Sequence, residues 1–118
     1  MALAPERIVL RFARTVQARH GLVEGHPILG TAPDGPVRFL EHGLTFEADV
    51  VQEQKTGHFL DQRDNRARVD RASRGKRVLD VFACTGGFSV HAAAGGAASV
   101  VSVDQSAPAL ATAERNMA

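Results

Sequence analysis

Two closely spaced apolar runs in the last third of the sequence predict a pair of buried strands. Residues 78–82 form a nearly continuous apolar run interrupted only by Asp80, and a second run, residues 100–103, ends at Asp104. Continuous runs of this kind are typical of strands covered on both faces. Residues 88–94 between them are rich in alanine and predict a short helix. A strand, a helix and a second strand in this order form a βαβ unit with parallel strands.

The first 36 residues follow a different pattern. Ile8, Phe12 and Val16 recur four residues apart, which predicts a helix from Pro5 to His20 that ends at Gly21. Residues 21–36 hold four glycines and three prolines, so we expect a connector with little regular structure.

Between these parts, alternation of apolar and polar positions predicts a hairpin of two strands, residues 37–40 and 44–51, with one buried side. A polar helix is expected from Asp61 to Ser73. A last helix runs from Ala107 to about Asn116 and is capped by Ser106. We therefore expect three segments: an N-terminal helix and connector (1–36), a hairpin and loop (37–60), and the start of an α/β domain (61–118).

The turn after the first buried strand is a candidate ligand site. In open α/β sheets, small molecules bind beyond the carboxyl ends of the strands. Gly86 and Gly87 carry no side chain to block a ligand, and the N–H groups that begin the next helix point into the same space. Asp104 is expected at the tip of the neighbouring strand, where its carboxylate can accept hydrogen bonds from both hydroxyls of a ribose. The predicted ligand therefore contains a nucleoside.

The glycine pattern narrows the choice of nucleoside. The turn reads Cys-Thr-Gly-Gly-Phe-Ser and lacks the third glycine of a dinucleotide fingerprint, and no Lys-Ser or Lys-Thr completes a P-loop. A carboxylate at Asp80 suits a ligand with a cationic end. S-adenosylmethionine has a ribose, an amino acid end and no phosphate, so it fits best. A dinucleotide-dependent oxidoreductase is the weaker alternative.

Two blocks of sequence carry a resemblance to a known family. They are EHGLTFEADVVQEQKTGHFLDQRDNR and VLDVFACTGGFSVHAAAGGAASVVSVDQSAPAL, and together they resemble the class I S-adenosylmethionine-dependent methyltransferases that modify cytosine C5 in large-subunit ribosomal RNA. The resemblance implies an incomplete Rossmann-like methyltransferase fold, βαβα, preceded by the N-terminal helix and the hairpin. It also implies S-adenosylmethionine as cofactor and ribosomal RNA as acceptor. A cytoplasmic location is the default expectation, because the single cysteine cannot form an internal disulfide and no apolar stretch has the length of a signal or membrane-spanning segment.

Cofactor-binding positions carry over from the family residue by residue. In the segment that leads from the hairpin into the polar helix, the resemblance implies Lys55, Thr56, Gly57, Phe59, Asp61, Gln62 and Arg63. In the glycine motif and at the end of the second strand, it implies Asp80, Phe82, Thr85, Gly86, Gly87, Phe88 and Asp104. One departure from the family is Cys84, where an aromatic residue is frequent.

Cys84 is a candidate nucleophile, because cytosine C5 methylation generally needs a thiolate that attacks C6 of the base. Helix N–H groups nearby could lower its pKa. The resemblance argues against this role, because the family's nucleophile lies well downstream of the second Rossmann strand. We therefore interpret Cys84 as a small residue that packs in the loop. His91, inside the alanine-rich helix, is interpreted as structural.

Composition limits the other roles. The chain has 14 basic and 13 acidic residues, so no global field argues for nucleic acid or membrane binding. The arginines of the polar helix other than Arg63 are interpreted as a solvated face held by pairs such as Asp64 with Arg68, with contact to RNA phosphates as the alternative. His20 and His26 lack cysteine or carboxylate partners at metal-ligand spacing, so no metal site is predicted. No apolar stretch has the length of a membrane span.

The two predicted strands are fewer than the seven of a class I methyltransferase. Their edges and faces would then have too few neighbours, and exposed edges invite association. We expect either a truncated or fragmentary reading frame, whose missing C-terminal half would cover those edges, or a homodimer. The favoured function is the cofactor-binding part of an RNA methyltransferase. The alternative is a non-catalytic nucleoside-binding or RNA-binding remnant of such an enzyme.

Overall fold

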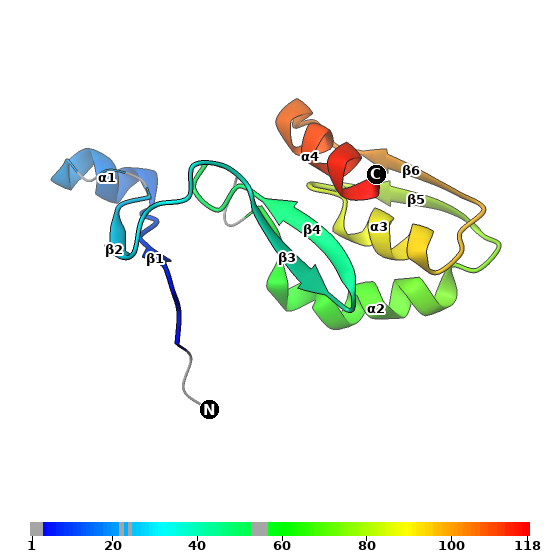
Figure 1. Ribbon diagram of the computed structural model, residues 1–118. Helices are drawn as coiled ribbons and strands as arrows, with labels where there is room; N and C mark the ends of the chain where they lie inside the picture. Colours follow the sequence, from blue (N-terminus) through cyan, green and yellow to red (C-terminus); the bar gives the residue numbers. More distant parts are fainter. Residues whose placement is uncertain (1–3, 22, 24, 53–56) are drawn as a thin grey trace. The chain divides into compact units, whose positions relative to one another are not determined.

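The first of two compact units is a small antiparallel sheet with one helix. The computed structural model describes residues 4–21, 23, 25–52 and 57–118, and it divides into Met1–Pro36 and Val37–Ala118. In the first unit, β1 (Ile8–Val9) pairs with β2 (Pro27–Leu29), and α1 (Arg14–His20) lies between them in sequence. These elements are blue to cyan in Figure 1.

The helix predicted from Pro5 to His20 is wrong over its first half, because residues 8–9 are a strand and only Arg14–His20 are helical. Two β-branched residues in succession favour extended backbone. Hydrogen bonds from Leu10 N–H to the His26 carbonyl (2.9 Å) and from Gly25 N–H to the Leu10 carbonyl (3.0 Å) continue the pairing. The connector predicted to lack regular structure therefore supplies β2. Gly21 ends α1 with a φ of 61°, as predicted.

The second unit contains the α/β elements. In chain order they are β3 (Val37–Glu41), β4 (Leu44–Ala48), the short 3₁₀ helix η1 (Leu60–Gln62), α2 (Arg63–Ala72), β5 (Arg77–Val81), α3 (Gly87–Ala94), β6 (Ser99–Val103) and α4 (Ala107–Met117). The hairpin prediction is confirmed, since β3 and β4 pair antiparallel through a two-residue turn. The second strand was expected to reach Val51 but ends at Ala48, where the Asp49 side chain accepts hydrogen bonds from the N–H groups of Val51 and Gln52 and turns the chain. His42 and Gly43 form that turn with φ values of 51° and 82°, which is typical of tight hairpins.

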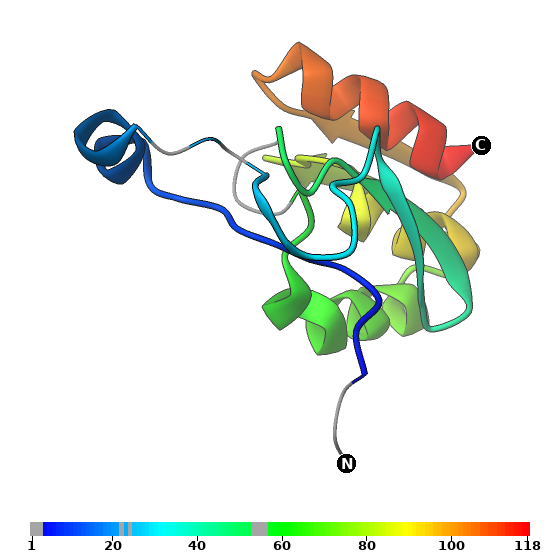
Figure 2. The ribbon, with the colours of Figure 1, turned by 60° about the vertical axis from the view of Figure 1, so that its left-hand side comes forward.

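The predicted βαβ unit is also confirmed. β5 and β6 are parallel in the register Leu79 opposite Val101 and Val81 opposite Val103. α3 packs on one face of this pair and against α2, so that it lies between the two (Figure 1, Figure 2). α4 packs against α3 and β4. It begins at Ser106, whose hydroxyl accepts a hydrogen bond from the N–H of Ala109, as the sequence predicted.

The face of β5 and β6 that points away from α3 is open. Leu79 and Val101 are 64% and 54% exposed, and Val81 and Val103 are 49% and 47% exposed. The prediction of strands covered on both faces is therefore wrong for this structure, because the described residues supply helices to only one face. The expectation of too few neighbours is confirmed. No described helix is long and apolar enough to cross a membrane.

Candidate cofactor site

A sharply coiled loop follows β5. Phe82, Cys84 and Gly86 have positive φ values of 63°, 49° and 77°, and such values are uncommon for residues other than glycine. Ala83 N–H donates to the carbonyl of Val103 (3.1 Å), and Gly86 N–H donates to the carbonyl of Ala83 (2.8 Å). The loop thus continues the pairing with β6 and then turns directly into α3.

Asp104 joins the end of β6 to this loop. Its Oδ2 accepts a hydrogen bond from Cys84 N–H and its Oδ1 accepts one from Ser106 N–H, both at 2.9 Å. These two bonds, led by that of Ser106, hold the pKa of Asp104 below its ordinary value of 3.8. An ionised carboxylate has about four lone-pair sites. The carboxylate therefore keeps acceptor capacity beyond its backbone donors, as a ligand hydroxyl would require.

The glycines of the loop make room for protein rather than for a ligand. A Cβ on Gly86 would lie 2.9 Å from the Cβ of Ala113 on α4. A Cβ on Gly87 would lie 3.1 Å from the Cδ of Arg66 on α2. From the sequence alone, the absence of side chains at Gly86 and Gly87 is expected to leave space for the ligand. In the structure, they let α4 and the Arg66 side chain pack against the start of α3.

Asp80 points to the α3 side of the sheet. Its Oδ2 accepts the hydroxyl proton of Ser89 (2.7 Å), and the Ser89 hydroxyl also lies 2.6 Å from that of Ser102 on β6. Ser89 is fully buried and Asp80 is half-buried. Among the described residues, no donor is hydrogen-bonded to Oδ1 of Asp80. One oxygen of Asp80 thus has a structural role and the other is available to a ligand.

Thr85 fixes the loop from two sides. Its buried hydroxyl donates to the carbonyl of Gly57 (2.6 Å), and its own carbonyl accepts a hydrogen bond from Asn116 Nδ2 (2.9 Å). The Oδ1 of Asn116 in turn accepts from Glu47 N–H on β4 (2.8 Å). The segment before η1, the glycine loop, β4 and the end of α4 are thereby linked through two side chains.

The remaining predicted positions are more scattered. Lys55 and Thr56 lie outside the described residues. The side chains of Asp61 and Gln62 are hydrogen-bonded to each other, and Gln62 is also bonded to Asn65. Arg63 is exposed at the start of α2.

The three predicted phenylalanines differ in exposure. Phe82 is 86% exposed, while Phe59 is 38% exposed. Phe88 is half-buried with its ring 6.0 Å from the guanidinium carbon of Arg66. The structure thus brings together Gly57, the glycine loop and Asp104, but it does not draw Asp61 or Gln62 into that group.

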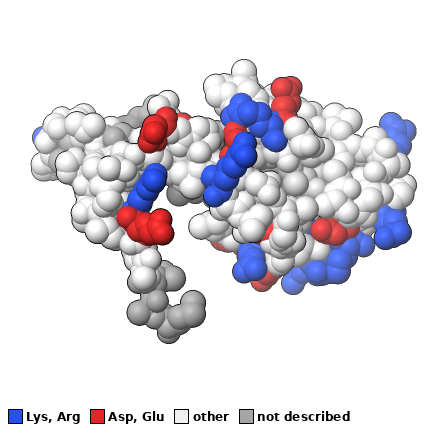
Figure 3. Space-filling view, in the orientation of Figure 1, with Lys and Arg blue, Asp and Glu red and all other residues white. Residues whose placement is uncertain are grey.

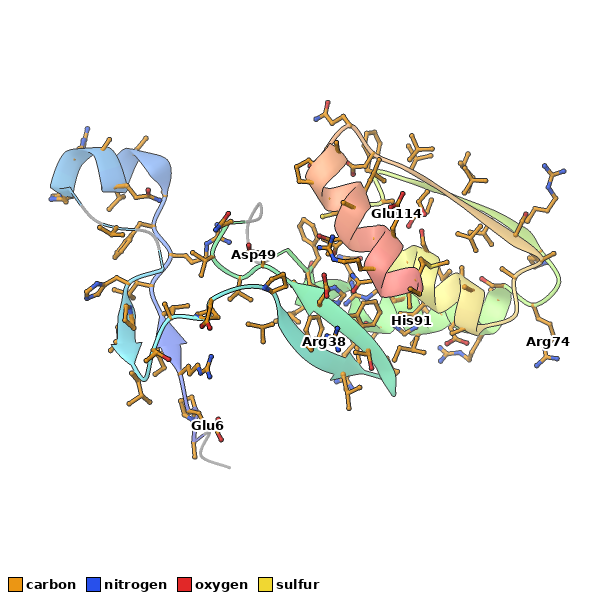
Figure 4. All side chains as sticks on the ribbon, turned by 45° about the horizontal axis from the view of Figure 1, so that its top comes forward. Glu6, Arg38, Asp49, Arg74, His91 and Glu114 are labelled. Carbon is orange, nitrogen blue, oxygen red and sulfur yellow. The ribbon has the colours of Figure 1, made fainter. Side chains whose placement is uncertain are left out.

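A buried ionic cluster lies beneath the loop. Glu41, at the end of β3, receives two hydrogen bonds from Arg66 on α2, Nε to Oε1 and Nη2 to Oε2, each 2.6 Å. His91 Nε2 lies 3.1 Å from Oε1, and His58 Nε2 lies 3.5 Å from Oε2. All four side chains are at least 95% buried. Figure 4 labels His91 on α3, at the centre of the second unit.

The cluster also supports the segment that was predicted to line the cofactor. Arg66 Nη1 donates to the carbonyl of Phe59 (2.9 Å), and this carbonyl also accepts from Gln62 N–H (3.0 Å). Two carbonyls of the segment 57–59 are therefore held, one by Arg66 and one by Thr85. In the described part of the chain, no group of three or more His, Cys, Asp or Glu side chains has a geometry that could hold a metal ion.

These contacts predict a stability that falls in two steps with acidification. Burial and the charge of Arg66 lower the pKa of His58 below 6.5. Below pH 6.5, His58 is therefore protonated more readily in the unfolded state than in the folded state. The free energy of unfolding declines as pH falls through 6.5. Burial alone would raise the pKa of Glu41, but its hydrogen bonds and charge interaction with Arg66 lower it from 4.5 to about 2. The stability from the ionised carboxylate is therefore present above 4.5 and is lost toward pH 2.

Urea unfolding at a series of pH values measures both steps. Glu41→Gln should reduce the lower step, with Asp104 supplying the part that remains, while Glu114→Gln, which changes an exposed carboxylate on α4, should leave it unchanged. A wild-type free energy of unfolding that stays constant between about pH 7 and pH 3 would contradict this assignment.

Sequence reasoning missed most of this support. Arg66 was grouped with the solvated arginines, although it occupies the same helix face as half-buried Val69 and buried Ser73. That spacing of three and seven residues was the available signal. Nothing comparable marked Glu41 or Asn116, whose partners are 25 and 31 residues away. The interpretation of His91 as structural agrees with its complete burial.

Comparison with known proteins shows which family the chain belongs to. Residues 14–117 match the family model described as S-adenosylmethionine-dependent methyltransferase. The chain belongs to this family. It is 52% identical over 121 residues to the ribosomal RNA large subunit methyltransferase of Deinococcus radiodurans, covering 99% of this chain and 30% of that protein. It is 44% identical over 104 residues to ribosomal RNA large subunit methyltransferase I of Pseudoalteromonas translucida, covering 86% and 26%.

A solved structure agrees with both the fold and the cofactor class. A candidate methyltransferase complexed with S-adenosylhomocysteine (SAH) matches at a TM-score of 0.71 and 33% identity, over 77% of this chain and 24% of that one. The methyltransferase fold and the dependence of the family on S-adenosylmethionine are thus established. The chain spans less than a third of the length of these relatives.

Proposed function

We propose that the chain is the cofactor-binding part of an S-adenosylmethionine-dependent methyltransferase that acts on ribosomal RNA. The observation that carries the proposal is the position of Asp104. Its carboxylate lies at the carboxyl end of β6, is tied by a hydrogen bond to the loop that follows β5, and keeps acceptor capacity for a ligand.

Roles follow for the other residues of the site. The ribose lies on Asp104, and the amino acid end lies toward the free oxygen of Asp80 and the N–H groups that begin α3. Phe82, exposed beside the loop, offers an aromatic surface to the ligand. Gly57 is held beside the glycine loop by Thr85. Lys55, Thr56 and Arg63 are proposed as further cofactor contacts from the sequence resemblance alone. Gly86 and Gly87 act indirectly, because they let α4 and Arg66 fix the loop.

The acceptor proposed is C5 of a cytosine in ribosomal RNA, in the cytoplasm. Support comes from the names of the relatives, which act on large-subunit ribosomal RNA, and from the sequence resemblance. S-adenosylmethionine, held at Asp104 and the glycine loop, would supply the methyl group that replaces the hydrogen at C5. Cys84 is not assigned as the nucleophile, because the sequence resemblance implies a nucleophile well downstream of β6. No other cysteine exists in the chain, so base activation is assigned to no residue here.

A covering for the open face of β5 and β6 belongs to the same proposal. Leu79, Val81, Val101 and Val103 form an apolar surface of the kind that methyltransferase sheets bury. The curated relatives are more than three times as long as this chain, so a further segment of the fold is the proposed covering. A homodimer is the alternative, and the molar mass in solution distinguishes it.

Replacing Asp104 by alanine should weaken binding of SAH by at least about tenfold, because two ribose hydroxyls lose a charged acceptor. Calorimetric titration measures the affinity, and thermal unfolding of the same samples shows whether the variant is folded. Glu114→Ala, which removes an exposed carboxylate on α4, is the matched control and should bind as the wild type does. Unchanged affinity in a folded Asp104→Ala variant would remove the ribose assignment.

A further inference from the structure

Charge in this chain is concentrated in one short segment. Residues 63–77 contain seven of the 14 basic residues and two acidic ones, a net charge of +5. The whole chain has a net charge of +1, so the other residues together have a net charge of −4. Because the two parts nearly cancel, the net charge of the whole chain does not reveal that positive charge is concentrated in residues 63–77.

Six of the seven basic side chains of this segment are exposed. Arg66 is the exception, since it is buried against Glu41. The exposed ones form what we term the basic strip: Arg63, Arg68 and Arg71 on α2, Arg74 and Lys76 in the turn that follows, and Arg77 at the start of β5. Figure 3 shows Lys and Arg side chains gathered along the lower edge of the second unit, where α2 runs in Figure 1.

The basic strip is not neutralised within the chain. Among the described residues, no carboxylate lies within 4.0 Å of its Lys or Arg nitrogens, and the ion pairs present involve Arg66, Arg115, His58 and His91. The pair of Asp64 with Arg68, expected from their spacing, is not formed. Asp70 is oriented toward His91 instead, with 3.6 Å between carboxylate oxygen and ring nitrogen. A partner therefore gains charge contacts here without breaking existing ones.

The strip has the dimensions and chemistry of a phosphate track. Ten helical residues extend α2 over about 15 Å, a length that spans more than one phosphate of an extended RNA strand. Arginine donates two parallel hydrogen bonds to a phosphate, and five of the six residues are arginines. No aromatic side chain interrupts residues 63–77, so the strip suits the nucleic-acid backbone rather than its bases.

The strip begins six residues after Gly57, the residue whose carbonyl is bonded to the glycine loop. Its first residue, Arg63, follows η1 directly, and the segment before η1 is bonded to Thr85 of the glycine loop. Its far end lies beyond α2, where Figure 4 labels Arg74. An RNA strand laid along α2 would thus run toward the segment that is bonded to the glycine loop of the proposed cofactor site.

We propose that the basic strip binds the phosphate backbone of the RNA substrate. This inference rests on the proposed function, since it assigns the substrate-binding surface of that same enzyme. It differs from a general attraction of positive protein to RNA, because the remainder of the chain has net negative charge.

The test compares two triple variants with the same change of net charge. One is Arg68→Gln, Arg71→Gln, Arg74→Gln within the strip, and the other is Arg7→Gln, Arg19→Gln, Arg38→Gln at exposed positions elsewhere. Binding of a fluorescent single-stranded RNA is measured by anisotropy over a series of salt concentrations. The strip variant should bind at least about tenfold more weakly, and its slope of log affinity against log salt should shrink by about 2, at about 0.7 per phosphate contact.

Each alternative result overturns the proposal. Equal losses in the two triple variants would mean that net charge alone attracts the RNA. Unchanged RNA binding in the strip variant, with loss of its binding to phosphatidylserine vesicles, would assign the strip to a membrane surface. Titration with S-adenosylmethionine separates this inference from the proposed function: the strip variant should bind the cofactor normally, and Asp104→Ala should bind RNA normally.

Discussion

Arg66→Ala is expected to destabilise the second unit by about 3–5 kcal/mol, the range for removal of one partner from a buried ion pair. Arg66 is 2% exposed, and it donates to both oxygens of Glu41 and to the carbonyl of Phe59. Its removal leaves a buried carboxylate whose remaining neighbours are two histidines, and it frees a carbonyl in the segment next to the cofactor site. Urea unfolding followed by circular dichroism measures the loss.

Arg68→Ala is the matched control, since Arg68 is an exposed arginine on the same helix. Its stability should stay within about 0.5 kcal/mol of the wild type. The double variant Glu41→Leu, Arg66→Met removes both charges and should be more stable than Arg66→Ala, because no carboxylate is then left buried without a cation. If Arg66→Ala unfolds at the same urea concentration as Arg68→Ala, the cluster does not support the fold.

Gly95→Ala should be at least as damaging, with a loss of more than about 4 kcal/mol or no folded protein. Gly95 ends α3 with an ordinary φ of −71°, so alanine fits its own backbone. The added Cβ would, however, lie 1.9 Å from the carbonyl oxygen of Asp70 and 2.6 Å from its carbon. Since the obstacle is the backbone of α2, no side-chain rotation relieves it, and α2 would have to move away from α3.

Gly35→Ala is the matched control for this substitution, because a Cβ there meets nothing within 4 Å and its φ lies outside the left-handed region. Thermal unfolding should place this variant at or slightly above the wild type, since alanine restricts the unfolded chain. A Gly95→Ala protein that melts with the wild type would show that the helices are less closely packed than in the structure.

The elements recovered from the sequence are those with local signals. Period-two alternation located β4, continuous apolar runs located β5 and β6, and Ser106 marked the start of α4. The first predicted helix was wrong because the spacing of Ile8, Phe12 and Val16 mimics a helix, whereas pairing of residues 8–9 with β2, almost twenty residues away, decides the structure. Long-range pairing of this kind leaves no local signal.

The candidate site, like the fold, has some features that the sequence predicts and others that it does not. Asp104 and the loop 82–87 could be predicted, because a βαβ unit brings the end of β6 beside the turn after β5. The bond from Cys84 N–H to Asp104 and the contacts that require Gly86 and Gly87 could not, since they depend on how the loop coils and where α4 packs. Glu41 and Arg66 were missed for a related reason: a buried charge is recognised only through its partner.

The most direct test of the account is calorimetric titration of the purified 118-residue chain with S-adenosylmethionine and, separately, with NAD. Saturable binding of S-adenosylmethionine, absence of binding to NAD, and competition by SAH are predicted, because we propose Asp104 as the ribose acceptor and the turn lacks the third glycine of a dinucleotide fingerprint. A folded sample that binds NAD and not S-adenosylmethionine, or that binds neither, would contradict the claim that these residues form a methyl-donor site.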